Sequence, residues 1–280
     1  MKRAIVPILL SSIALGAVAQ ELPAPSPLGM VKQRVGLTDV TVEYSRPNAK
    51  GRQIFGDLVP FDQLWRTGAN NSTSIEFSSN VKIEGTEVPA GKYYVITMPS
   101  ESGWQVMLNT NSEISGTDGY NPEQNVAHIK VQPSKCEFVE TLTFTFQDVK
   151  DDKARLDLAW ENTRVSIWIQ ADCTDQAVAN IKEALAKPDV SYNGYSRSAR
   201  FCVDRGIMLS DALGWATKSV EMEKKYWNTH TLALAQAANG LYREAIATAE
   251  MSMQLAVEAK ADGAVKDNKA RIEEWKMKAQ

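Results

Sequence analysis

The sequence predicts an α+β protein of two domains, an N-terminal antiparallel β-sandwich of jelly-roll-like form followed by a C-terminal tetratricopeptide-like helical domain. Two observations lead to this prediction. From residue 28 to 172, short segments rich in β-branched and aromatic residues alternate with clusters of Gly, Pro, Asn and Ser. From residue 173 to 280, apolar residues recur at three- and four-residue spacing and Ala becomes frequent, as is typical of helices.

Residues 1–19 are predicted to be a secretory signal peptide. A basic pair, Lys2 and Arg3, precedes an apolar run and a small-residue site that ends at Ala19, where we expect cleavage. The apolar run is shorter than the about 20 residues needed to span a bilayer. We therefore expect no membrane span and a periplasmic or extracellular location.

Composition limits the class of the mature protein. The chain has 280 residues, of which 44% are hydrophobic and 23% charged, as in ordinary globular proteins. Without the signal peptide, 29 of the 31 basic residues remain against 34 acidic ones, a net charge of −5. A mildly acidic chain without a basic tract is a poor nucleic-acid binder, so no nucleic acid is expected as a partner. The Pro-rich residues 20–27 predict an extended leader.

The β domain is expected to contain about nine or ten short strands, a number that favours a sandwich, with a closed barrel as the alternative. The segments with strand character are 31–35, 40–44, 73–77, 81–83, 92–98, 104–109, 126–131, 142–146, 156–160 and 165–169. Polar residues at 148–153 and 161–163 predict turns that join the last three segments into a meander.

The helical domain is expected to contain about five or six antiparallel helices. Thr174 or Asp175 can cap the first helix and Pro188 ends it, while residues 266–278 form the last. One tetratricopeptide-like hairpin is indicated by Leu232, Ala233, Gln236, Gly240, Tyr242, Ala245 and Ala249, and a weaker echo by Ala212, Ala216 and Ser219. A plain bundle that supports the β domain is the alternative.

Residues 44–70, YSRPNAKGRQIFGDLVPFDQLWRTGAN, have neither helical nor strand periodicity and predict a shaped loop. Loops on a rigid scaffold often carry binding or catalysis. Guanidinium groups suit anions and an indole can stack on a sugar ring, so we expect an anionic or glycan ligand. The candidate binding residues are Arg46, Lys50, Arg52, Trp65, Arg66 and Asn70. The alternative is a structural clamp whose arginines pair with Glu43, Asp57 and Asp62.

The chain offers few residues for metal or cofactor chemistry. It has only two histidines, His128 and His230, and lacks HExxH, paired CxxC and phosphate-loop motifs, so neither a metal site nor a cofactor is predicted. His128, on the polar face of its strand, is the candidate general base of an enzyme. Glu43 and Asp57 are alternative bases.

The three cysteines leave their pairing open. Cys136 could pair with Cys173, or Cys173 with Cys202, and free buried thiols fit the sequence equally well.

A set of short motifs runs through the β domain. They are YSRP (44–47), KGR (50–52), IFG (54–56), VP (59–60), WRTGAN (65–70) with Thr73, VPAGKY (88–93), Trp104 and Asn109. Together they resemble a family of secreted bacterial proteins known as a domain of unknown function, family twenty-nine eleven. Members similarly carry a helical tail, so the resemblance covers nearly the whole mature chain. Asn125 and His128 replace an expected Asp and Arg.

The resemblance implies an exported envelope protein and supplies no established activity or catalytic residues. Our first hypothesis is a non-enzymatic binding protein that uses the loop of residues 44–70. The second is a periplasmic hydrolase or lyase acting on a glycan or a small carboxylated substrate at the same loop. The third is a helical tail that binds a protein partner, which a polar, Tyr- and Asn-lined concave face would favour.

Overall fold

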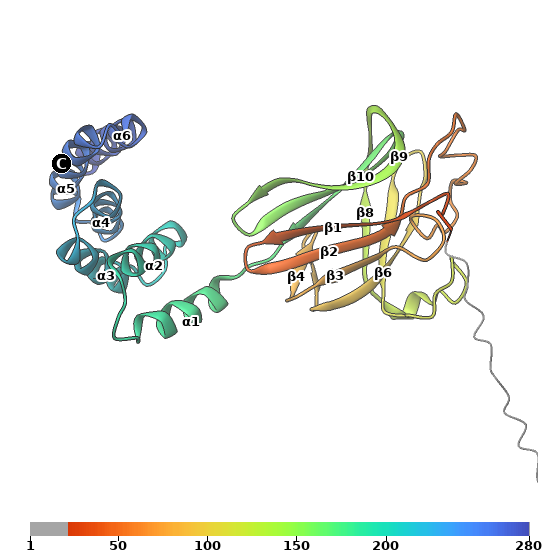
Figure 1. Cartoon of the computed structure of the whole chain (residues 1–280), viewed down its shortest axis with the longest axis horizontal. Coiled ribbons are helices and arrows are strands. Elements are labelled where there is room, and N and C mark those ends of the chain that lie inside the picture. The colour runs from red at the N-terminus through yellow and green to blue at the C-terminus, as the bar shows by residue number, and fades with distance from the viewer. Residues whose placement is uncertain (1–21, 280) are drawn as a thin grey trace, which may run out of the picture. The chain divides into compact units, whose positions relative to one another are not determined.

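The computed structural model of the chain describes residues 22–279, and the predicted signal peptide lies outside them. The chain divides after Cys173 into two units, which we call the β unit and the helical unit and describe separately. Strands make up the first and helices the second (Figure 1). This is the α+β layout that the sequence predicts.

The β unit contains two antiparallel sheets in its described residues, 22–173. One has six strands in the order β1-β2-β3-β6-β7-β8, and the other has four in the order β5-β4-β10-β9. The strands are β1 Leu28–Val35, β2 Thr38–Ser45, β3 Ser74–Phe77, β4 Val81–Ile83, β5 Thr86–Val88, β6 Gly91–Met98, β7 Trp104–Asn109, β8 Asn125–Val131, β9 Pro133–Lys150 and β10 Lys153–Gln170. A single 3-10 turn, η1 Pro122–Gln124, leads into β8.

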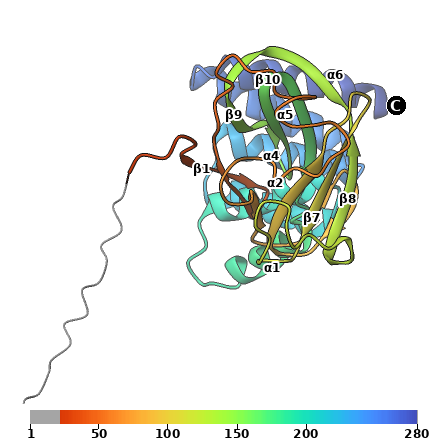
Figure 2. The ribbon, with the colours of Figure 1, turned by 90° about the vertical axis from the view of Figure 1, so that its right-hand side faces the viewer.

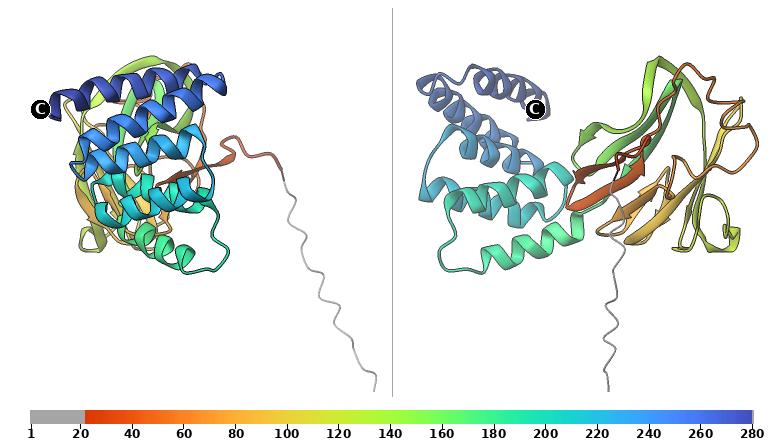
Figure 3. Two further views of the ribbon diagram at one scale, coloured as in Figure 1. Left: turned by 90° about the vertical axis from the view of Figure 1, so that its left-hand side faces the viewer. Right: turned by 45° about the vertical axis from the view of Figure 1, so that its right-hand side comes forward.

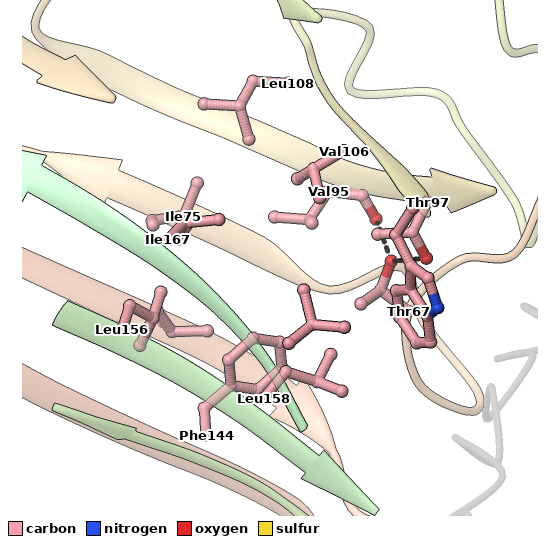
Figure 4. Close-up of a pocket in the computed structure, with 13 residues that line it drawn as sticks. Thr67, Ile75, Val95, Thr97, Val106, Leu108, Phe144, Leu156, Leu158 and Ile167 are labelled. Carbon is pink, nitrogen blue, oxygen red and sulfur yellow. Dashed lines mark hydrogen bonds between the residues drawn. The ribbon is translucent and has the colours of Figure 1, made fainter. Parts of the chain in front are cut away.

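The two sheets bury a shared apolar core. In β2, Val40, Val42 and Tyr44 are buried and alternate with half-buried residues, so one face of the strand is removed from water. Val42 belongs to the same core as Leu156 and Ile167 of the other sheet. Between the sheets lies a cavity of about 30 Å³ with an almost wholly apolar lining (Figure 4). Because drug-sized ligands occupy some hundreds of Å³, this cavity is no candidate site.

The predicted meander of three strands after residue 140 is wrong, because β10 continues through the expected turn at 161–163. Glu161 has φ 54°, and the pairing with β9 shifts on both sides of it, so it forms a bulge within one strand. Beyond the bulge, Thr163 pairs with Lys135. That partner lies in the first half of β9, which the sequence analysis does not predict. The long β9–β10 pair bends over the other strands (Figure 2).

In residues 174–279 the helical unit consists of six helices. They are α1 Thr174–Leu185, α2 Tyr192–Arg205, α3 Leu209–Met222, α4 Tyr226–Ala238, α5 Tyr242–Glu258 and α6 Asp262–Lys278. From α2 onward each helix packs on the next, and they lie side by side as antiparallel neighbours (Figure 3). Small buried residues such as Ala199, Ala216, Ala233 and Ala249 let the helix axes approach closely.

A polar hydrogen-bond pattern occurs twice in this unit. Ser219 Oγ on α3 donates to the carbonyl of Tyr192 on α2 (2.8 Å), and Asn228 on α4 donates to Ser219 Oγ (2.9 Å). The second copy links α4, α5 and α6, since Ser252 donates to the carbonyl of Tyr226 (2.7 Å) and Asn268 donates to Ser252 (3.1 Å). The two tyrosines are separated by about 34 residues, the tetratricopeptide period.

Two of the cysteines, Cys136 and Cys202, carry free thiols, so neither takes part in a disulfide bond. Burial raises the pKa of both thiols above the ordinary value. Within residues 22–279, no helix combines the length and the apolar character that a bilayer crossing requires.

Candidate functional site

In the loop of residues 44–70, Arg46 is bonded to the edge strand β9. Its Nε donates to the carbonyl of Leu142 (3.2 Å) and its Nη2 to Thr143 Oγ1 (2.9 Å). The stem of Arg46 lies so close to Gly29 that a Cβ there would come within 2.7 Å of Cδ. The guanidinium therefore satisfies main-chain and hydroxyl acceptors on the edge of β9, where the loop backbone also pairs with the strand, since Ala49 N–H donates to the Glu140 carbonyl (2.7 Å) and Leu142 N–H to the Pro47 carbonyl (2.9 Å).

Arg52 and Lys50 lie farther along the same loop. Arg52 donates to the carbonyls of Asn48 (2.7 Å) and Ala49 (2.9 Å), which holds the turn together. Lys50 has φ 52° and its main-chain N–H donates to Glu140 Oε1 (2.9 Å), while the residue itself is exposed. Thus the Arg52 side chain is bonded within the loop, whereas the side chain of the exposed Lys50 makes no hydrogen bond or ion pair with the described residues.

Asn70, at the end of the loop, connects it to the leader. Its Nδ2 donates to the carbonyl of Ser26 (2.9 Å) and to Ser45 Oγ (3.4 Å). The predicted leader, residues 20–27, is therefore bonded to the sandwich at its end.

Trp65 belongs to an aromatic cluster that joins the loop to both sheets. Its ring stacks on Trp160 at a centroid distance of 6.0 Å and meets Phe55 and Trp104 edge-on at 5.9 and 6.2 Å. Only 9% of Trp65 is exposed, and its Nε1 donates to the carbonyl of Gly68 (3.1 Å). The indole lies in the core, so neither of its faces is available as a platform for a sugar.

Arg66 differs from the other loop arginines. It is half-buried, and its Nε is buried with no hydrogen-bond partner in the described part of the chain. Its Nη1 lies beside Gly116. The carbonyls of Gly116 and Ile114 both accept a hydrogen bond from Ser72 Oγ. Arg66 is therefore the loop guanidinium that the fold uses least.

His128, the predicted general base, is exposed on β8. Its Nε2 lies 2.6 Å from Oε1 of Gln105 on the neighbouring strand. That bond orients the ring, but it supplies no acid to relay a proton. Among residues 22–279, no group of three or more His, Cys, Asp and Glu side chains is placed to hold a metal ion.

Two adjoining hollows lie in the helical unit, on what we call the α2–α4–α6 face. Their volumes are about 270 and 420 Å³. Arg200, His230 and Asp267 line both hollows; Ser196, Arg197, Tyr226, Trp227, Thr231 and Ala264 complete the first, and Ala270, Arg271 and Glu274 the second. All of these residues come from α2, α4 and α6, the alternate helices of the array.

Several side chains on this face are exposed. Trp227 is 42% exposed, its Nε1 donates to Asn193 Oδ1 (3.4 Å), and its ring meets Tyr226 edge-on at 5.0 Å. Arg197 and Asp267 are exposed, and residues 22–279 supply no ion-pair or hydrogen-bond partner for either side chain. An aromatic surface, a free cation and a free carboxylate are therefore accessible together.

His230 is fixed within this face by a buried amide. Its Nδ1 lies 2.8 Å from Oδ1 of Asn268, which is fully buried. Burial lowers the pKa of His230, and the hydrogen bond to Asn268 opposes that effect. Arg200 and Arg271 lower the pKa further, whereas Asp267 raises it. The imidazole is thus held neutral at the wall of both hollows.

The family of the chain follows from its β unit. Residues 26–169 match the model of a family described as a protein of unknown function, DUF2911. The chain belongs to the DUF2911 family. Among curated proteins, none matches the chain by sequence. The resemblance inferred from the YSRP and WRTGAN motifs is thereby confirmed, although the DUF2911 match ends before the helical unit.

In this DUF2911 protein the matched region contains the 44–70 loop, and the hollows fall outside it. No residue of the α2–α4–α6 face is among the site residues predicted from the sequence. A signal was present, because Arg197 and Arg200 lie on one side of α2 and Trp227 and His230 on one side of α4 at helical spacing. The grouping was missed because α2 and α4 come together only in the folded chain.

Proposed function

We propose that this protein is an exported binding protein whose helical unit holds a segment of a partner polypeptide. The observation that carries the proposal is the pair of adjoining hollows on the α2–α4–α6 face, whose lining includes the exposed ring of Trp227 and two charged side chains, Arg197 and Asp267, that have no partner among residues 22–279. Binding sites are commonly concave and combine apolar surface with a few convergent polar groups.

The chemistry of the face favours a polypeptide over a neutral glycan. Arg197 offers a free cation on α2 and Asp267 a free carboxylate on α6, with the half-exposed ring of Trp227 on α4. A peptide can present an acidic, a basic and an apolar side chain to such a surface at once. Trp and Arg are also the residues that most often dominate binding energy at interfaces.

The test is a selection of displayed peptides on the full mature chain, compared with an Arg197→Ala/Trp227→Ala variant. The matched control is Arg243→Ala/Trp168→Ala, which removes an exposed arginine of α5 and a tryptophan of the β unit that is 43% exposed. We expect selected peptides to lose at least about tenfold in affinity for the first variant and to keep it for the second. If no sequence is enriched, or both variants bind alike, the proposal is wrong.

A second candidate function is binding of an anion at Arg66, favoured by its buried Nε, which lacks an acceptor among residues 22–279. Burying a polar group without a partner is costly, and an anionic oxygen would remove that cost. The probe is inorganic phosphate, and the Tm of the wild type and of Arg66→Gln is measured with and without it. A phosphate-dependent rise in Tm in the wild type alone supports this site, and equal behaviour of both proteins contradicts it.

A further inference from the structure

The hydrogen bonds around Asn268 determine which nitrogen of His230 faces outward. Asn268 Nδ2 donates to the carbonyl of Ala264 (2.8 Å) and to Ser252 Oγ (3.1 Å), and a carbonyl can only accept. The Asn268 oxygen must then be the atom directed at the ring, where it accepts from His230 Nδ1–H at 2.8 Å. In the neutral imidazole, Nε2 consequently carries the lone pair and remains available at the hollow.

Cations outnumber carboxylates by one around the two hollows that His230 lines. Of the residues lining the larger hollow, Arg200 donates through Nε to both oxygens of Asp204 (2.8 Å each), and Arg271 pairs with Glu274 (2.9 Å). Lys278 also pairs with Glu274 (2.7 Å), and Asp267 is the remaining carboxylate. These three cations and three carboxylates balance, Arg197 of the adjoining hollow adds a fourth cation, and a proton on His230 adds one more positive charge.

Donor groups remain for a ligand. Each arginine uses one nitrogen in its ion pair, so the Nη groups of Arg200 and the Nη2 of Arg271 are uncommitted within the described chain. Guanidinium nitrogens bind carboxylates well because two of their N–H groups match the two oxygens. A protonated His230 would add a third donor, Nε2–H, on the same wall.

We propose that Arg200, His230 and Arg271 form a carboxylate-binding subsite, which accepts an acidic side chain or terminal carboxylate of the ligand when His230 is protonated. The subsite rests on the function proposed for the α2–α4–α6 face and specifies the ligand group that this part of the face recognises. Binding takes up one proton from solvent. The proton adds to Nε2 of His230 and remains there in the complex, where Nε2–H donates to the bound carboxylate.

The sign of the pH effect follows from linkage. A bound carboxylate favours the charged imidazolium, so the pKa of His230 is higher in the complex than in the free protein. Proton uptake then accompanies binding, and affinity rises as the pH falls through the interval between the two values. Each pH unit by which binding raises the pKa of His230 corresponds to a gain of about tenfold in affinity.

The experiment uses the two histidines of the chain as its readout. In the untagged mature protein, His128 and His230 give the only imidazole NMR signals, and a His128→Asn variant assigns them. The pKa of His230 is measured in the presence of succinate, as the carboxylate probe, and of succinamide as its neutral control. We expect succinate to raise this pKa by about half a pH unit or more and succinamide to leave it unchanged.

Two further measurements complete the test. In Arg200→Gln/Arg271→Gln, succinate should no longer shift the His230 signal, while the circular dichroism of the helices stays as in the wild type. The subsite is refuted if succinate and succinamide act alike on wild-type His230.

Failure of the subsite can be distinguished from failure of the proposed function. Selected peptides that bind the α2–α4–α6 face equally at pH 5.5 and 7.5, with no enrichment of acidic residues, would refute the subsite and leave peptide binding intact. If succinate raises the pKa of His230 but no displayed peptide is selected, the subsite stands and the proposed peptide binding is refuted.

Discussion

Trp65 in the 44–70 loop and Trp227 on α4 show how differently the two units use one residue type. Trp65 is 9% exposed, stacks on Trp160 and donates its N–H to a carbonyl of its own loop. Trp227 is 42% exposed, at the wall of a hollow. The arginines differ in the same way, since Arg46 donates to Leu142 and Thr143 and Arg197 is exposed without a partner among residues 22–279.

A high density of Arg, Trp and Gly indicates that the side chains of a segment have a specific role. It does not show whether that role is to stabilise the fold or to bind a ligand. In the loop these side chains connect the two sheets and the strand edge. Tyr44 adds another such link, because its hydroxyl accepts the main-chain N–H of Phe144 at 3.0 Å. On the α2–α4–α6 face, side chains of the same kinds are left accessible.

The largest expected effect is that of Trp65→Ala. Removing a buried indole leaves a cavity among Phe55, Trp104 and Trp160 and should lower the free energy of unfolding by about 3–5 kcal/mol. Trp227→Ala, at a half-exposed site, should cost less than about 1 kcal/mol. Urea denaturation of the mature chain measures both values. Similar losses in the two variants would remove the contrast between the loop and the helical face.

A smaller effect is expected from Arg46→Ala. The substitution leaves the Leu142 carbonyl and Thr143 without their donor, and should cost about 1–3 kcal/mol. The matched change Arg197→Ala should stay within about 0.5 kcal/mol, as at ordinary surface positions. Both are compared by their urea midpoints at unchanged slope. A loss for Arg197 as large as for Arg46 would mean that the helical face uses its arginine for folding.

Arg66→Ala sharpens the comparison inside the loop itself. Because the Nε of Arg66 has no acceptor among the described residues, its removal should cost less than about 1 kcal/mol, less than the loss of Arg46. The same urea series provides the measurement, and Arg52→Ala is the control for an arginine bonded to carbonyls. A cost of about 3 kcal/mol or more would instead identify Arg66 as half of a buried pair.

The smallest effect is a pH dependence in the helical unit. Burial holds the pKa of folded His230 below the ordinary value of 6.5, so the unfolded chain binds more protons just below that pH. The stability of the helices should be constant above about pH 6.5 and decline as the pH falls toward the folded value. Thermal melts followed at 222 nm between pH 5 and 8 record the change.

His230→Gln is the control for this dependence, since it keeps an N–H donor for Asn268 and removes the titration. If the variant shows the same decline as the wild type, the proton responsible lies elsewhere.

The fold was largely predictable because its signals are local. Val40, Val42 and Tyr44 alternate as the residues of a half-buried strand do, and the change to helical spacing near Asp172 marks where the helices begin. The error at Glu161 has a physical cause. The polar triplet 161–163 has the composition of a turn. In the structure the residues around Glu161 pair with the first half of β9, so Glu161, with φ 54°, forms a bulge within one strand.

The candidate sites were less predictable. The sequence alone determined the change from strands to helices, most of the strand and helix segments and the family to which the β unit belongs, because these depend on periodicity and short motifs; the first half of β9 and the continuity of β10 were missed. The tertiary structure decided that Trp65 is buried, that Arg46 bonds to a strand some hundred positions away and that Arg200, His230 and Arg271 line one hollow. The reason is that a side chain is used by the fold or left to solvent according to its neighbours in space, and those neighbours come from distant parts of the chain.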